Sequence, residues 1–292
     1  MMFFLRCFFC VILSFSLYAE GDSIVLLAEN NSPALNNLYK KVKQLAPELN
    51  LVISTQQSPF NINSNDYVVL VGGDVPKHID ISTLTNSIAI MVTKNQSKRL
   101  NVKTSVWVEP PLKRQFELAN LVIPGNSKVG LLVNGAVDKQ IQVESLDERQ
   151  REMLNIVDIS EYDNLNQALY KVLKESKLIL ASYNNAIYNA KNIKNILITS
   201  YRQQKVLIGP SRAFLRAGSF ATTFSNMDHI AQRLVDIIQH HKNTGMWLSA
   251  DYNPHYRILF NHQVARSLDV PLVDVELLRQ QMIETKSPQA RE

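Results

Sequence analysis

The sequence has 292 residues, a length that fits one large domain or two modest ones. Hydrophobic residues make up 46% of it and charged residues 20%, which is typical of folded globular proteins and argues against wholesale disorder. The net charge is only +5 and no long basic run occurs, so a nucleic-acid partner is not expected. The nine glycines form neither a Gly-x-x-x-x-Gly-Lys nor a Gly-x-Gly-x-x-Gly pattern, so neither a P-loop nor a dinucleotide-binding motif is expected.

The N-terminal segment predicts a secretory signal peptide over residues 1–19. Arg6 precedes an apolar run that is shorter than the roughly 20 residues of a membrane-spanning helix. Cleavage is expected after Ala19, and a retained N-terminal anchor is the alternative. Both cysteines, Cys7 and Cys10, lie in this segment, so the mature chain has no disulfide, catalytic thiolate or cysteine-ligated metal. We therefore expect an exported protein, periplasmic if the source is Gram-negative.

Short apolar runs alternate with helix-forming segments along the rest of the chain. Most runs are rich in β-branched residues, which is typical of strands buried on both faces. In chain order, strands are expected at Ile24–Ala28, Leu51–Ser54, Tyr67–Val71, Ile88–Val92, Val129–Val133, Asn155–Ile159, Leu178–Ala181, Val206–Ile208 and Phe220–Phe224. Helices with one apolar stripe are expected over 33–45, 110–122, 165–173, 190–201 and 230–238.

This alternation of strands and helices predicts an α/β protein with largely parallel sheets. The strands are too many for one comfortable sheet, and Pro124-Gly125 divides them into two groups. The chain is therefore expected to form two α/β lobes. Ligands of such sheets bind outside the carboxyl ends of the strands, so the segments that follow the strands are the candidate binding residues.

Two candidate segments belong to the first group of strands. Asn31 and Ser32 precede a helix N-terminus, where an anionic or hydroxylated ligand can bind; the alternative is that Ser32 only caps the helix. Gly73 allows a ligand to approach the backbone closely, and Asp74 can receive an ammonium group. The alternative for Asp74 is to cap a short helix that starts at Pro76.

The second group of strands contains the strongest local signal for binding. Tyr183, Asn184 and Asn185 follow the strand at Leu178–Ala181, and they offer a flat aromatic face together with amide donors and acceptors. Asn134 follows the strand at 129–133 and is expected beside them.

Ser211 and Arg212 follow the strand at 206–208, and Arg212 can clamp a carboxylate or a phosphate. A solvated surface arginine or an ion pair across the lobes is the alternative. Ser211 is not expected to be a catalytic nucleophile, since Ala213 stands where a nucleophile elbow has glycine. The histidines show no metal-binding spacing, because the adjacent His240 and His241 cannot face one ion. We expect no cofactor, no metal and no catalytic residues.

Four stretches of the chain together carry a resemblance to one protein family. They are PPLKRQFELANLVIPGNSKVGLLVN (110–134), LILASYNNAIYNAKNIKNIL (178–197), VLIGPSRAFLRAGSFATTFSN (206–226) and YRILFNHQVARSLDVPL (256–272). They resemble the periplasmic substrate-binding proteins of ABC transporters, of the type often grouped with tryptophan and tyrosine transport. Asn184 and Asn185 stand where this family has a polar pair after a strand, Ser211 and Arg212 fit its small polar turn, and Asn261 fits its last helix start.

The resemblance implies the type I periplasmic binding protein fold, with two Rossmann-like lobes of parallel sheets and a ligand cleft between them. It also implies three crossings of the chain between the lobes, near Pro124, Thr223 and Asp251. The expected parts are a signal peptide (1–19), lobe 1 (20–124 plus 224–250), lobe 2 (125–223 plus 251–285) and a flexible tail (286–292).

The function implied by the resemblance is that of a solute-binding protein of an ABC-type importer, without catalytic activity. Its partners would be a small, amino-acid-like polar solute and the membrane permease on which the closed lobes dock, and it would be a monomer. The alternative is a periplasmic ligand-sensing or adaptor subunit for a membrane signalling protein. This alternative is suggested by the loops after Gly73 and Thr93, which are shorter than is usual in the family.

Overall fold

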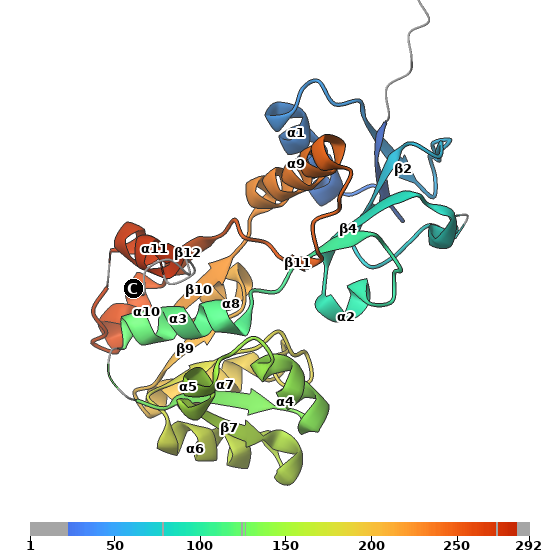
Figure 1. The fold of residues 1–292 in the computed structure, drawn as a ribbon. Helices are drawn as coiled ribbons and strands as arrows, with labels where there is room; N and C mark the ends of the chain where they lie inside the picture. Colours follow the sequence, from blue (N-terminus) through green and yellow to red (C-terminus); the bar gives the residue numbers. More distant parts are fainter. Residues whose placement is uncertain (1–22, 78, 124, 126, 273, 285–292) are drawn as a thin grey trace, which may run out of the picture.

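The structure is a computed structural model that describes residues 23–77, 79–123, 125, 127–272 and 274–284. The expected signal peptide (1–19), Pro124 and the expected tail (286–292) lie outside the described residues. The chain forms two α/β lobes, each built on a six-stranded sheet (Figure 1). This confirms the predicted fold of two lobes with parallel-dominated sheets.

The sheet of the first lobe is parallel throughout. From edge to edge it contains β11 (Asp251–Tyr252), β5 (Thr104–Trp107), β4 (Asn86–Val92), β3 (Tyr67–Val71), β1 (Ile24–Ala28) and β2 (Leu51–Thr55). The sheet of the second lobe is parallel except for its edge strand β12. It contains β12 (Arg257–Phe260), β10 (Ala221–Phe224), β9 (Val206–Gly209), β8 (Leu178–Leu180), β6 (Val129–Val133) and β7 (Leu154–Asp158).

Both sheets use the same strand order. Numbered within each lobe, the five strands that come first in the chain are arranged 2-1-3-4-5. The order reverses beside the first strand, so the carboxyl ends of β1 and β3, and of β6 and β8, flank the crevices where doubly wound sheets bind ligands.

The helices are distributed between the two lobes. The first lobe has α1 (Pro33–Leu45), α2 (Lys94–Ser97), α9 (Met227–Thr244) and the 3-10 turn η1 (Ile81–Thr83). The second lobe has α3 (Leu112–Val122), α4 (Gly135–Val143), α5 (Glu148–Glu152), α6 (Leu165–Glu175), α7 (Ile193–Arg202), α8 (Arg212–Ala217), α10 (His262–Ser267), α11 (Val275–Glu284) and the 3-10 turn η2 (Ile159–Glu161). No helix of the described residues is both long enough and apolar enough for a membrane span.

In the first lobe, α1 and α9 together cover one face of the sheet. Ser32 caps α1 by accepting a hydrogen bond from the Leu35 N–H (3.1 Å), and Pro33 occupies the first turn. The opposite face is covered by loops, by η1 and by the short α2. The described residues around Pro76 form no helix, so the expected capping role of Asp74 is wrong, and Asp80 caps the next helical turn instead.

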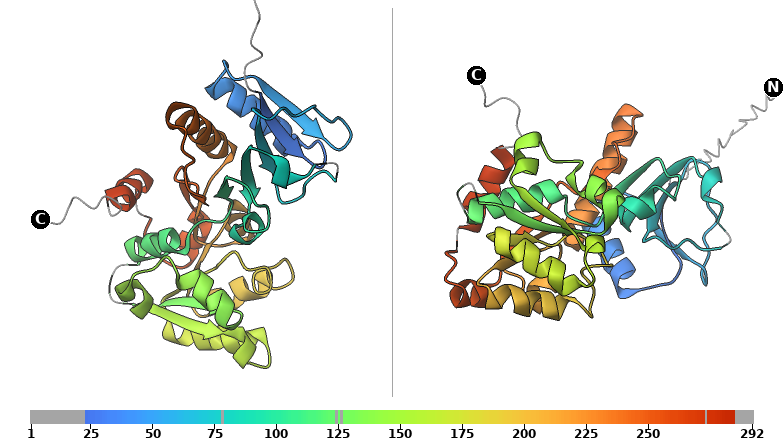
Figure 2. Two further views of the ribbon diagram at one scale, coloured as in Figure 1. Left: turned by 45° about the vertical axis from the view of Figure 1, so that its right-hand side comes forward. Right: turned by 90° about the horizontal axis from the view of Figure 1, so that it is seen from below.

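In the second lobe, helices cover both faces of the sheet. Phe116 and Leu118 of α3 pack on one face together with α11, which lies beside α3 (Figure 2). The opposite face is covered by α6 and α7, through residues such as Leu169 and Ile196. The helices predicted around 33–45, 110–122, 165–173, 190–201 and 230–238 are confirmed as α1, α3, α6, α7 and α9.

The chain passes between the lobes in three linkers, at 108–111, 225–226 and 253–256. The first linker lies earlier than the crossing expected near Pro124, because the apolar stripe of α3 is buried in the core of the second lobe. The last linker lies later than the crossing expected near Asp251, because β11 pairs with β5 of the first sheet. Residues 112–123 therefore belong to the second lobe, and Asp251 and Tyr252 belong to the first.

The first turn of α3 follows the first linker and is bonded to the third linker and to β10, the strand that leads into the second linker. Arg114, which is 4% exposed, donates a hydrogen bond to the Asn253 carbonyl (2.8 Å) and stacks on the ring of Tyr256. Gln115 donates to the Gly209 carbonyl (2.8 Å) and accepts hydrogen bonds from the N–H and hydroxyl of Thr223. The linkers thus meet at one buried polar junction.

Replacing Gly130 by alanine should destabilise the second lobe. The added Cβ would lie 2.8 Å from Val172 Cγ2 and 2.9 Å from Ser176 Oγ, where β6 passes under α6. Overpacking of this kind costs about 1–3 kcal/mol. Urea unfolding monitored by circular dichroism measures the loss. Gly73→Ala is the control with a smaller expected loss, because its Cβ would meet the flexible end of the Gln96 side chain. Equal losses for the two variants would contradict the prediction.

Candidate functional site

A cavity of about 440 Å³ lies between the lobes, next to the linkers. Its second-lobe wall consists of residues that follow β6, β8 and β9, and its first-lobe wall is formed by α2 and β11. The lining residues are Lys94, Asn95, Glu109, Pro110, Leu112, Gln115, Asn134, Val137, Asp138, Ile141, Gln142, Ser145, Ala181, Ser182, Tyr183, Asn184, Asn185, Pro210 and Tyr252.

Asp138 organises the polar wall of the second lobe. Its Oδ2 accepts hydrogen bonds from the Asn134 N–H (2.8 Å) and from Asn184 Nδ2 (2.7 Å), and its Oδ1 accepts one from Gln142 Nε2 (3.2 Å). Asn184 in turn accepts a hydrogen bond from the Ala186 N–H through its Oδ1 (2.9 Å). The carboxylate therefore fixes the β6–α4 and β8–α7 segments relative to each other.

Two side chains that follow β8 are available to a ligand. Ser182 is only 4% exposed, and its Oγ has no hydrogen-bond partner among the described residues. Tyr183 is 44% exposed and presents its ring to the cavity wall. Partial burial, together with the nearby Glu109 carboxylate, raises the pKa of Tyr183.

Glu109 brings a second carboxylate to the cavity, on the first linker. Its Oε1 accepts a hydrogen bond from the backbone N–H of Lys94 (2.7 Å). Its Oε2 is buried and has no hydrogen-bond partner among the described residues. Burial raises the pKa of Glu109 above the usual range of a carboxylic acid. The field of Glu109 reaches Tyr252, whose pKa is raised to about 12 by burial and then by this carboxylate.

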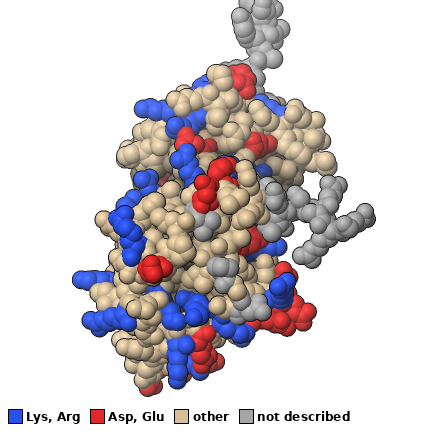
Figure 3. Space-filling model, turned by 90° about the vertical axis from the view of Figure 1, so that its left-hand side faces the viewer, with Lys and Arg blue, Asp and Glu red and all other residues tan. Residues whose placement is uncertain are grey.

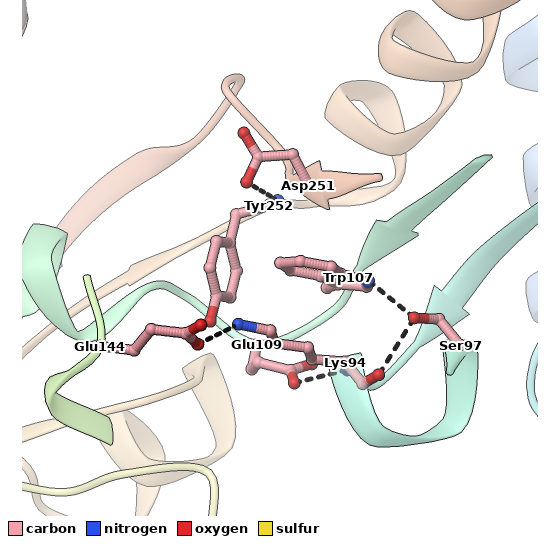
Figure 4. Close-up of polar contacts among 7 residues, drawn as sticks. All are labelled: Lys94, Ser97, Trp107, Glu109, Glu144, Asp251 and Tyr252. Carbon is pink, nitrogen blue, oxygen red and sulfur yellow. Dashed lines mark hydrogen bonds and ion pairs between the residues drawn. The ribbon is translucent and has the colours of Figure 1, made fainter. Parts of the chain in front are cut away.

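Lys94 connects the two lobes at the edge of the cavity (Figure 4). Its Nζ forms an ion pair with Glu144 Oε2 at 2.7 Å, which joins α2 of the first lobe to the end of α4 in the second. The same ammonium lies 5.1 Å from the centre of the Trp107 ring, and Trp107 packs edge-on against Tyr252. The Lys94 ammonium therefore already interacts with the Glu144 carboxylate and with the face of the Trp107 ring.

The structure brings four of the ten predicted binding residues together. Asn134, Tyr183, Asn184 and Asn185 all line the cavity, as the positions after β6 and β8 indicated. The other predicted residues do not line it, and they are Asn31, Ser32, Gly73, Asp74, Ser211 and Arg212.

The predicted residues outside the cavity have local roles or lie in solvent. Asn31 accepts a hydrogen bond from Asn36, and Ser32 caps α1. Asp74 and Arg212 are exposed. The structure therefore differs from the expectation that Arg212 clamps an anion in this cavity, because the polypeptide after β9 places Pro210, not the arginine, at its wall.

The residues that the sequence analysis missed are Lys94, Glu109, Asp138 and Tyr252. Lys94 follows β4 and Glu109 follows β5, so the rule that ligands bind after parallel strands would have included both. The sequence analysis did not predict β5, because Thr104 and Ser105 are buried polar residues and the strand lacks a continuous apolar run. Glu109, which follows β5, was therefore not considered. Asp138 and Tyr252 carry no local signal, because their positions depend on the packing of α4 and β11. Among the described residues, no three His, Cys, Asp or Glu side chains form a group that could hold a metal ion.

Glu109→Gln should raise the melting temperature of the ligand-free protein at pH 7. Glutamine can still accept the Lys94 N–H bond, but it removes a charge that burial disfavours. A carboxyl group whose pKa is raised by folding destabilises the folded state when it is ionised. This penalty disappears at a pH low enough to protonate the group in the folded and in the unfolded state. The gain should therefore shrink as the pH falls toward about 4.

Glu144→Gln is the control, and it should change the melting temperature in the opposite direction. The pKa of Glu144 is lowered by its hydrogen bond and ion pair with Lys94, so its charge stabilises the fold above its ordinary pKa. This variant should lower the melting temperature slightly at pH 7, and the loss should fade in acid. A melting temperature that falls at pH 7 for Glu109→Gln would contradict the prediction for the cavity acid.

Comparison with protein-family models and with curated proteins gives no match for this chain. Solved structures match it over most of its length. A ligand-free, open structure of a substrate-binding protein with adhesive properties from Clostridium difficile has a TM-score of 0.62 and 12% identity, covering 87% of this chain and 97% of its own. An ABC domain in complex with L-Trp from Streptococcus pneumonia has a TM-score of 0.50 and 17% identity, covering 88% and 98%.

A third match is a chain from a mutant form of the XylFII–LytSN complex. It has a TM-score of 0.55 and 14% identity, and it covers 83% of this chain and 99% of its own. These similarities extend over both lobes, and at such low identity they establish the fold. The chain has the two-lobed type I periplasmic binding protein fold, the fold of the substrate-binding proteins of ABC transporters.

Proposed function

We propose that this protein is an exported solute-binding protein of an ABC-type importer, which binds a small polar organic solute between its lobes. The observation that carries the proposal is the cavity at the junction of the two lobes. Its walls come from segments that follow parallel strands, which is where ligands of such folds bind. Its volume of about 440 Å³ is within the range of small-molecule sites.

The chemistry of the cavity wall supports an amino-acid-like solute. Amide groups of Asn134 and Asn185, the hydroxyl of Ser182 and the phenol of Tyr183 offer hydrogen bonds in several directions. The rings of Tyr183 and Tyr252 offer apolar faces. The similar structure with bound L-Trp is consistent with a solute of this kind.

Hinge closure would complete the site from the first lobe. Asn31, Ser32, Gly73 and Asp74 follow β1 and β3, so we propose that they approach the solute when the lobes close.

The proposal includes export through the segment at 1–19, action as a monomer, and binding without catalysis. The descriptions of the similar structures as binding proteins and transporter domains support a binding role. On the face shown in Figure 3, Lys and Arg side chains are interspersed with acidic ones. Such a mixed surface supports a partner other than nucleic acid.

A second candidate function is a ligand-sensing or adaptor subunit for a membrane protein. The observation in its favour is the similar chain found in the XylFII–LytSN complex, in which a protein of this fold is bound to another protein. The neighbouring genes distinguish the two candidates. Genes for a permease and an ATPase would favour transport, and a gene for a membrane kinase or cyclase would favour sensing.

A thermal-shift screen of the chain from Glu20 onward tests the proposed function. Amino acids, organic amines, nucleosides, sugars and small organic acids are the probes. A solute at a hundredfold excess over its Kd stabilises the folded state by about 2.7 kcal/mol. Tyr183→Ala should abolish the shift, since this partly exposed ring lines the cavity.

Tyr170→Ala is the matched control, because Tyr170 is a 59% exposed tyrosine on α6, outside the cavity. It should leave the shift unchanged. X-ray scattering should show a smaller radius of gyration when the solute is present. A well-folded chain that no probe stabilises would contradict the proposed function, and so would a shift that survives Tyr183→Ala but not Tyr170→Ala.

A further inference from the structure

We propose that the solute is an organic amine with a net positive charge, and that Glu109 holds its ammonium group. This inference rests on the proposed solute-binding function and names the chemical class of the ligand. It narrows the amino-acid-like class of the proposed function to molecules that keep the amino group, because it predicts that the bound molecule has no carboxylate to balance the charge of that group.

The first argument is the unused hydrogen-bonding capacity of two buried oxygens on residues that line the cavity. Glu109 Oε2 is buried without a hydrogen-bond partner, and so is the Oγ of Ser182, which is 4% exposed. Both residues line the same cavity, from the first linker and from the second lobe. An ammonium group donates up to three hydrogen bonds and carries the opposite charge to a carboxylate, so it supplies what Glu109 Oε2 lacks.

The second argument is the charge of the lining residues. Glu109 and Asp138 are acidic, and Lys94 is the one Lys or Arg among the described residues that line the cavity. The Lys94 ammonium is ion-paired with Glu144 and lies over Trp107, and no ion pair of the described residues joins it to Glu109 or Asp138. Its charge does lower the pKa of Glu109, but burial, which raises that pKa, has the larger effect. A cationic ligand restores the balance of charge at this site, whereas an anionic one opposes it.

The third argument is that the usual position for a ligand carboxylate is already filled. Backbone N–H groups at a helix N-terminus bind anions, and the start of α4 borders this cavity. There, the Asn134 N–H donates to Asp138 and the Gly135 N–H donates to Asp158 (2.9 Å). After β8, the Ala186 N–H donates to the Asn184 side chain. The protein's own acceptors therefore use three of the N–H groups that could otherwise bind a ligand carboxylate.

The aromatic residues fit the same ligand. Tyr183 and Tyr252 line the cavity, and the electrostatic influence of Glu109 reaches both phenols. Aromatic faces attract ammonium groups and also cover the apolar part of an amine. The contact of Lys94 with Trp107 is an example of this interaction at the edge of the cavity.

Two sets of probes, one with a constant four-carbon chain and one with a shared indole-3-ethyl group, test the inference by calorimetry and thermal shift. The aliphatic set is putrescine, 4-aminobutyrate and succinate, and the aromatic set is tryptamine, L-tryptophan and indole-3-propionate. We expect the amine of at least one set to bind more tightly than its zwitterionic and anionic counterparts. We also expect Glu109→Gln to weaken that binding roughly 30-fold, since removing one partner of a desolvated charge pair is costly.

Glu175→Gln is the matched control. It removes one glutamate charge from an exposed i,i+4 ion pair on α6, outside the cavity, and should change the affinity less than twofold. Circular dichroism spectra establish that both variants are folded.

Each other outcome overturns the inference in a distinguishable way. If zwitterions, anions or neutral solutes bind and the amines do not, the ligand class is wrong while the solute-binding function stands. If an amine binds equally to the wild type and to Glu109→Gln, the role of Glu109 is wrong. If no probe of these sets or of the wider solute screen binds the folded chain, the inference and the proposed function both fail.

Discussion

The arrangement of the two lobes depends on the polar junction at the first turn of α3. Arg114 holds the third linker through the Asn253 carbonyl, and Gln115 holds the strand ends at Gly209 and Thr223. Both side chains are buried, so their hydrogen bonds are costly to break and they fix the linkers relative to one another. Glu109 lies on the linker that leads into this junction, and the cavity opens beside it. The acid that we assign to the ligand thus lies next to this junction, and its own hydrogen bond is with the Lys94 N–H of the first lobe.

The cavity contains a group that lowers the stability of the folded state, the buried carboxylate oxygen of Glu109. A buried carboxylate oxygen without a partner disfavours the folded state, and natural proteins keep such groups mostly where they bind or react. Asp138 shows the opposite situation on the facing wall, since its oxygens accept hydrogen bonds from Asn134, Asn184 and Gln142. The oxygens of Asp138 are used in organising the wall, whereas Glu109 keeps one buried oxygen without a hydrogen-bond partner among the described residues. The two carboxylates thus have different roles despite their proximity to the same space.

The two lobes contribute unequally to the site. In the second lobe, helices cover both faces of the sheet, and the segments after β6 and β8 supply most of the wall. In the first lobe, one face is covered only by loops, η1 and α2, and the wall consists of Lys94, Asn95 and Tyr252. The Lys94–Glu144 ion pair joins the lobes at this edge, and an ion pair with an exposed carboxylate contributes little to stability because water screens it. Such a weak contact is compatible with a hinge that opens and closes.

The sequence by itself determined the α/β class, the two lobes and most strands. Short runs such as Tyr67–Val71 are apolar on both faces, and they alternate regularly with helix-forming segments along the chain. It also located Asn134 and the 183–185 segment, since parallel strands deliver ligand-binding residues at their carboxyl ends. Only the tertiary structure decided that α3 belongs to the second lobe, because a helix with one apolar stripe fits either sheet until its neighbours are known. It alone placed Glu109, Asp138 and Tyr252 around one cavity and left Arg212 outside it. Glu109 follows β5, so the rule for parallel strands could have included it as a candidate. These residues nevertheless lie far apart in the chain, and their proximity is created by linker geometry and packing, which no local pattern of residues encodes.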